Sequence, residues 1–157
     1  MNNPENMSYC DESRALQPRP FLRTVTEDLV PGTGVLIYPE GTRFSRRKLK
    51  RARKALRDKG HDALAVRADN MNHVLPPRLA GPTALMQAAP ELDIVIMEHM
   101  GFEAASSGAS MWRGDLVGQT IRVRIRRFPA PKLAEGEHAN WLYDRWEEID
   151  GWVESNS

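Results

Sequence analysis

The stretch VLIYPEGTRF, residues 35–44, decides how the rest of the chain is interpreted. It begins with four apolar residues, and a short continuous apolar run of this kind is typical of a strand buried on both faces of a parallel sheet. The polar residues Glu40, Gly41, Thr42 and Arg43 follow after a single proline. Because ligands of open α/β folds sit at the carboxyl ends of the strands, we expect this polar group to form part of a ligand site.

Each residue of the group has a property suited to binding an anion. Gly41 lets the backbone turn tightly or approach a ligand closely. Arg43 carries a planar, permanently charged guanidinium that matches phosphate or carboxylate oxygens, and Thr42 can donate to the same anion. Glu40 can orient Arg43 or accept a hydrogen bond from a substrate hydroxyl. The alternative is a surface turn with a Glu–Arg ion pair, which contributes about 0–1 kcal/mol to stability.

Helical and strand patterns alternate along the chain. Hydrophobic spacing predicts helices over residues 21–30, 46–59, 81–90 and 138–155. Apolar runs predict strands over residues 35–39, 73–78, 92–99 and 120–128. This order favours an α/β fold, a small mixed or mostly parallel sheet flanked by helices. We expect residues 1–20, which are polar, to be disordered, and residues 21–157 to form a single domain.

The last predicted strand alternates strictly between apolar and basic residues. Ile121, Val123 and Ile125 occupy one face, and three arginines occupy the other. We expect the apolar face to be buried and the arginine face to be wet, at or near a sheet edge.

The net charge of +1 conceals a strong asymmetry along the chain. Ten basic residues and one acid lie between Arg43 and Lys59, whereas seven acids lie between Glu135 and Glu154. A local field of this kind attracts nucleic acid, an anionic membrane surface or a phosphorylated small molecule. The basic helix can also be a simple solvated face. It has no interleaved aromatic residues for base stacking, which argues against nucleic acid.

Other functional classes find no support in the sequence. A single cysteine, no apolar run long enough to cross a bilayer and no signal-peptide pattern suggest a cytoplasmic protein. One cysteine and scattered histidines give no metal-ligand spacing, so we expect neither a metal nor a bound cofactor.

Two motifs together resemble the glycerolipid acyltransferase family, the lysophosphatidic acid (1-acylglycerol-3-phosphate) acyltransferases and their relatives. The motifs are Pro39-Glu40-Gly41-Thr42-Arg43 and, further along, Val74-Leu75-Pro76-Pro77. The resemblance covers roughly residues 25–128 and implies part of an acyltransferase domain. It also implies that Glu40, Gly41, Thr42 and Arg43 bind the phosphate of a lysophospholipid, and that Pro76 and Pro77 shape the substrate channel. Acyl-CoA or acyl carrier protein would donate the fatty acyl group in phospholipid biosynthesis, at the inner face of the membrane.

The family's catalytic base is the histidine of a His-x4-Asp motif upstream of the Glu-Gly-Thr-Arg block. No histidine precedes His61 in this chain. His99 has Glu103 four residues later, but it lies downstream of the block and is only a secondary candidate. We therefore expect the chain alone to be inactive or very feeble, as a truncated product or as a part whose other half supplies the base. The alternative is a noncatalytic module that binds anionic lipid or nucleic acid through the basic helix 46–59.

Overall fold

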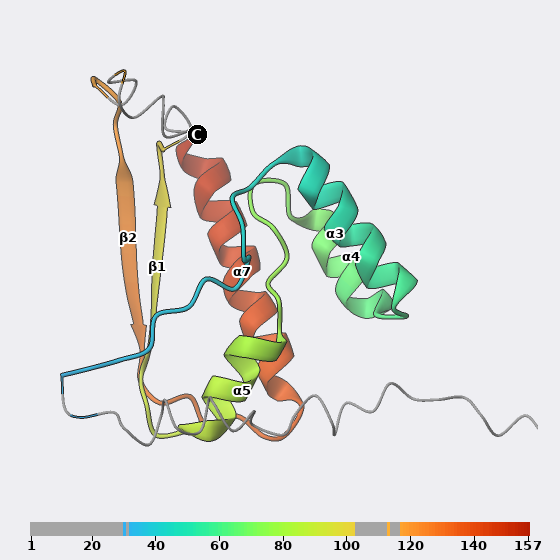
Figure 1. Cartoon of the computed structure of the whole chain (residues 1–157), viewed down its shortest axis with the longest axis vertical. Coiled ribbons are helices and arrows are strands. Elements are labelled where there is room, and N and C mark those ends of the chain that lie inside the picture. Colours follow the sequence, from blue (N-terminus) through green and yellow to red (C-terminus); the bar gives the residue numbers. More distant parts are fainter. Residues whose placement is uncertain (1–29, 31, 103–112, 114–116) are drawn as a thin grey trace, which may run out of the picture.

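The computed structural model describes residues 30, 32–102, 113 and 117–157. This part contains four helices and a two-stranded sheet, so the predicted mixture of helices and strands is confirmed (Figure 1). The predictions for residues 1–20 and for a helix over 21–30 lie outside the described residues, apart from Val30. None of the described helices combines the length and apolar character needed to cross a bilayer.

The sheet consists of β1, Ile94–Met100, and β2, Arg122–Phe128. Both strands were predicted from their apolar patterns, and both predictions are confirmed. The two strands are antiparallel, with Ile96 opposite Arg126, so the mixed or mostly parallel sheet that we expected is not found in the described part. An antiparallel pair needs no helical crossover between its strands.

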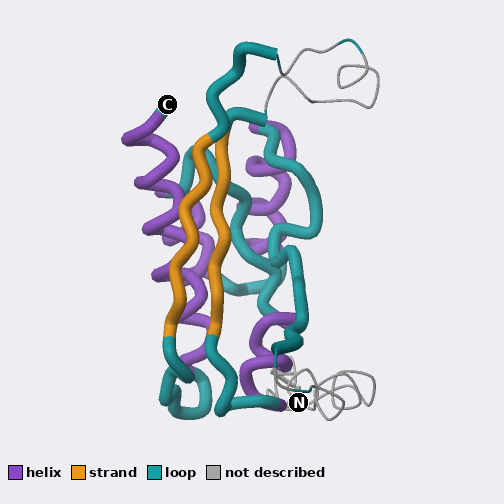
Figure 2. The backbone as a smooth tube through the Cα atoms, turned by 90° about the vertical axis from the view of Figure 1, so that its left-hand side faces the viewer, coloured by secondary structure: helices purple, strands orange, loops and turns teal. Residues whose placement is uncertain are grey.

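The prediction for the two faces of β2 was wrong. Val123 and Ile125 are 54% and 65% exposed, whereas Arg124 and Arg126 point toward the final helix. The arginines can occupy the covered face because that face also holds acidic and aromatic partners for their guanidinium groups. Figure 2 shows the strand pair from the side opposite to α7 (Glu137–Asn156), with no described element in front of it.

The final helix, α7 (Glu137–Asn156), forms the centre of the molecule. The sheet lies along one side of it, and α3 (Arg46–Asp58) and α4 (Asp62–Asn70) lie on the other (Figure 1). α5 (Ala80–Ala88) packs near the N-terminal half of α7. The predicted helices of residues 46–59, 81–90 and 138–155 are thus confirmed to within a few residues. The main core cluster comprises Met71, Val74, Ile96, Leu142, Tyr143, Trp146 and Ile149.

Two predicted strands are absent. Residues 35–39 and 73–78 form no strand ladder, and Leu36 and Tyr38 are 72% and 73% exposed. A single backbone bond joins the two segments, from the Arg78 N–H to the Pro39 carbonyl at 2.9 Å. The prediction failed because no described strand pairs with residues 35–39 and because the two prolines of the second segment cannot donate to a ladder.

Candidate functional site

The Glu-Gly-Thr-Arg block forms a tight turn that leads into α3. The Gly41 N–H donates to the Tyr38 carbonyl at 2.9 Å, and Gly41 has a φ of 66°, a left-handed conformation that favours glycine. Ser45 then caps α3, because its hydroxyl accepts a hydrogen bond from the Lys48 N–H at 3.3 Å. The block therefore forms a turn directly before a helix N-terminus, and it does not follow a strand.

Basic side chains surround this turn. The Lys48 ammonium donates to the Thr42 hydroxyl at 2.7 Å and to the Arg43 carbonyl at 3.0 Å. The Arg78 guanidinium lies against Gly41, so closely that a Cβ atom on Gly41 would be 3.0 Å from its Cζ. Arg43 itself is exposed to solvent. Three consecutive residues of the turn thus carry or contact a cation, an arrangement suited to an anion.

Glu40 has a different environment from the other residues of the block. Burial raises the pKa of its carboxyl to about 7, an effect that the backbone N–H of Leu75 and the indole of Trp146 partly oppose. No ion pair joins Glu40 to a basic residue within the described part of the chain. Glu40 is therefore partly withdrawn from water beside Leu75 and Trp146, and an ion pair of Glu40 with Arg43 is not observed.

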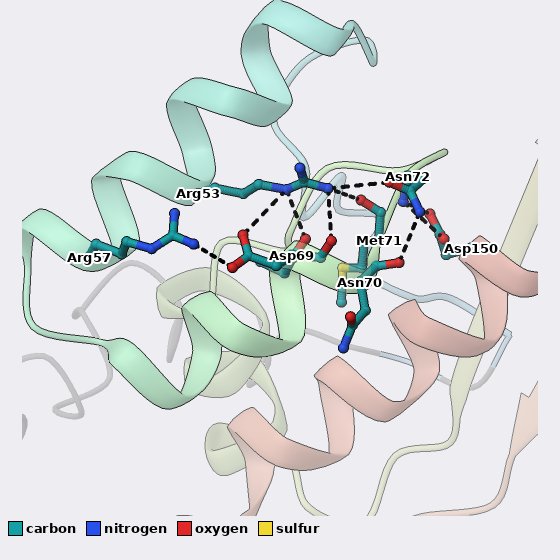
Figure 3. A network of polar contacts seen from close by, with 8 residues as sticks. Arg53, Arg57, Asp69, Asn70, Met71, Asn72 and Asp150 are labelled. Carbon is teal, nitrogen blue, oxygen red and sulfur yellow. Dashed lines mark hydrogen bonds and ion pairs between the residues drawn. The ribbon is translucent and has the colours of Figure 1, made fainter.

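The segment that carries Arg78 is held in place by a network of polar contacts from α3 and α7 (Figure 3). The buried carboxylate of Asp150 accepts hydrogen bonds from the backbone N–H groups of Asn72, His73 and Val74, at 2.6 to 3.1 Å. Arg53 of α3 donates to the carbonyls of Ala68 and Met71, at 3.1 and 2.6 Å. These bonds satisfy backbone groups that no sheet or helix satisfies, and they set the position of residues 72–78 relative to the turn.

The other predicted site residues are either buried or distant from the turn. Pro76 and Pro77 are both buried. His99 is exposed on the apolar side of the sheet, where its ring meets Phe102 edge to face at 5.0 Å between centroids. Its proposed acidic partner, Glu103, lies outside the described residues.

Two shallow hollows in the described part involve none of the block residues. The first, of about 390 Å³, is lined by Met86, Gln87, Pro90, Leu133, Glu135 and His138. The second is lined by Asn70, Met71, Glu147, Asp150, Gly151 and Glu154. Among the described residues there is no group of three or more histidine, cysteine, aspartate or glutamate side chains that could hold a metal ion.

Sequence reasoning missed Lys48 and Arg78. Lys48 is one of ten basic residues in its region, so no local signal distinguishes it. Arg78 directly follows the two prolines of the second motif, but its contact with Gly41 depends on how two distant segments pack. The signal that could have identified Arg78 is its position: it is a basic residue directly next to the second motif, as Lys48 is a basic residue near the first.

The basic helix presents a stripe of charge to solvent. Arg46, Arg47, Lys50 and Arg51 are exposed, and none of them has an ion pair or hydrogen-bond partner among the side chains described. They recur at a spacing that places them on neighbouring rows of one helix surface. Further along the helix, Lys54 pairs with Asp58, and Arg57 pairs with Asp69 of α4.

Comparison with known proteins adds no relative: no family model, no curated protein and no solved structure matches the chain.

Proposed function

We propose that this chain binds the phosphate of a lysophospholipid, 1-acylglycerol 3-phosphate, at the Glu-Gly-Thr-Arg turn. In this proposal it is the acceptor-binding part of an acyltransferase related to the glycerolipid acyltransferases. The observation that carries the proposal is the set of cations at the turn, with Lys48 on Thr42 and Arg78 on Gly41. A phosphate ester needs several positively charged donors that converge on one place, and the turn supplies them.

The acyl donor in this proposal is acyl-CoA or acyl carrier protein, and the reaction needs a general base on the acceptor hydroxyl. The sequence supplies no His-x4-Asp motif before the turn, and His99 lies on the sheet face opposite to α7. We therefore assign this chain acceptor binding and expect no efficient acyl transfer by the chain alone.

Two measurements test the proposal. Wild-type protein should bind micellar lysophosphatidic acid, and Arg43→Ala should weaken that binding by about tenfold or more, because it removes a charge-assisted contact to phosphate. A radiolabelled acyl-CoA assay should show negligible turnover. Binding that is unchanged in Arg43→Ala removes the role assigned to that residue, and robust turnover that His99→Ala abolishes makes His99 the base.

A second candidate function is favoured by the unpaired stripe on α3, which suits an anionic membrane surface. Basic residues near such a surface contribute about 1 kcal/mol each to membrane binding. A noncatalytic membrane-binding module would bind phosphatidylserine-containing liposomes whether or not they contain lysophosphatidic acid. Replacing Lys50 and Arg51 by glutamine should then reduce liposome binding, whereas a preference for a random DNA duplex at physiological salt would identify nucleic acid as the partner.

A further inference from the structure

The Arg78 guanidinium has no polar partner within the part of the chain that the structure describes. Its side chain is exposed and, across residues 32–102 and 117–157, its guanidinium forms no hydrogen bond or ion pair. Most other arginines in the described part that contact a second segment do so through carboxylates or carbonyls, namely Arg53, Arg57, Arg67, Arg124, Arg126 and Arg127. Arg78 instead lies against the peptide of Gly41, at a site where any larger residue would crowd it.

The backbone that leads to Arg78 is held at two points. Its own N–H is bound to the Pro39 carbonyl at 2.9 Å, and the segment begins at Val74, which Asp150 holds. Between these points lie Pro76 and Pro77, whose rings fix φ and are buried. The backbone that presents the guanidinium to the turn therefore has little freedom, so that little backbone entropy is lost when an anion binds.

The neighbouring cation has bonding capacity left. An ammonium group has three donors, and Lys48 uses two of them, on the Thr42 hydroxyl and on the Arg43 carbonyl. Lys48 contacts Thr42, and Arg78 contacts Gly41, the adjacent residue of the turn. The third donor of Lys48 and the Arg78 guanidinium thus belong to side chains at neighbouring positions. The only acid of the block, Glu40, makes no ion pair with either within the part of the chain that the structure describes.

We propose that Arg78 is a second phosphate-binding residue and that it selects a phosphomonoester against a phosphodiester. This inference rests on the proposed function, because it concerns the same site. A phosphomonoester has three terminal oxygens and a charge of about −1.5 to −2 at neutral pH, so that it can accept from an arginine fork and an ammonium together. A phosphodiester headgroup has one charge and two free oxygens, and it gains less from the second cation.

The test compares monoester and diester ligands by titration calorimetry. The soluble pair is glycerol 3-phosphate and glycerophosphoglycerol, and the lipid pair is micellar lysophosphatidic acid and lysophosphatidylglycerol. Arg78→Gln should weaken binding of both monoesters about tenfold and reduce the monoester preference by a similar factor. Arg78→Lys keeps the charge without the fork, and it should recover only part of the loss.

The matched control is Arg122→Gln, which removes the same charge from an exposed position on β2 and should leave monoester affinity unchanged. Arg78→Gln that behaves like this control overturns the inference, even if lysophosphatidic acid binds through Arg43. Arg78-dependent binding of glycerol 3-phosphate without any binding of lysophosphatidic acid supports the inference and contradicts the proposed function. A wild-type protein that binds none of the four ligands contradicts both. Thermal melting of each variant verifies that it is folded.

Discussion

Glu98 of β1 and Arg124 of β2 stand opposite each other and are joined by two hydrogen bonds, of 2.8 and 2.7 Å. The Glu98 side chain is only 2% exposed, and it also accepts from Arg126 at 2.8 Å. Across the interface, Trp152 of α7 lies beneath the Arg124 guanidinium, 4.9 Å from Cζ to the ring centroid. A buried carboxylate with two guanidinium partners therefore sets which face of the strand pair packs against α7.

Replacing Glu98 by alanine should destabilise the protein by about 3 kcal/mol, because it leaves Arg124 in a covered position without its acid and leaves Arg126 with Glu148 alone. Both arginines retain some contact with water, which places the effect at the lower end of the range for buried pairs. Urea denaturation measures the change. Glu91→Ala, an exposed glutamate before β1, is the control and should change stability by less than about 0.5 kcal/mol. A loss below about 1 kcal/mol in Glu98→Ala would show that this ion pair does not orient the sheet.

A second prediction concerns the exposed apolar face of the sheet. It compares Ile125, which lies on that face, with Ile96, which lies on the opposite face. Ile125→Thr should change the free energy of unfolding by less than about 0.5 kcal/mol, because most of that side chain is already in water. Ile96→Thr should cost about 2 kcal/mol or more, because Ile96 belongs to the core cluster and the new hydroxyl would be buried. Denaturation at several protein concentrations makes the comparison. A large, concentration-dependent cost at Ile125 would show that a second molecule covers this face in solution.

Asp150 provides a third prediction, on how the second motif is held. Asp150→Ala leaves the backbone N–H groups of residues 72–74 without their acceptor, and it should cost about 3 kcal/mol. Asp150→Asn keeps one acceptor oxygen and should cost less. Glu154→Ala, on the next turn of α7, is the control. If phosphate binding by the turn falls in Asp150→Asn while the protein stays folded, the position of residues 72–78 contributes to the site.

The strands and helices that the sequence predicted correctly are those with a strong local pattern. The apolar run of β1, the alternation in β2 and the hydrophobic spacing of α7 each specify an element without reference to the rest of the chain. Residues 35–39 have an equally apolar pattern, but a strand also needs a partner, and pairing is a tertiary property that a local window does not contain. Sequence alone therefore identified the segment and misjudged its state.

The error over the two faces of β2 has a similar cause. Hydrophobic alternation shows that two faces differ, and burial was assigned to the apolar one by default. The deciding residue, Glu98, lies on another strand, in register with Arg124. For the candidate site, the sequence identified the Glu-Gly-Thr-Arg turn, but Arg78 reaches Gly41 only through the folding of a separate segment.

The pH dependence of stability should contain a contribution from Glu40. Burial raises its pKa from the usual 4.5 to about 7 in the folded protein. Between these two values the unfolded chain releases this proton while the folded chain keeps it, so the free energy of unfolding falls as the pH rises and levels off above about pH 7. Glu40→Gln removes this titration, and its stability relative to wild type should increase by about 1–3 kcal/mol between about pH 5 and pH 8.

Urea denaturation of both proteins at the two pH values provides the test, because titrations elsewhere in the chain cancel in the difference. Glu135→Gln, an exposed glutamate before α7, is the control and should show no such difference. A constant difference between Glu40→Gln and wild type across this range would mean that Glu40 is solvated. In that case this carboxyl would not be withdrawn from water, and Glu40 would be available to pair with Arg43 at the surface.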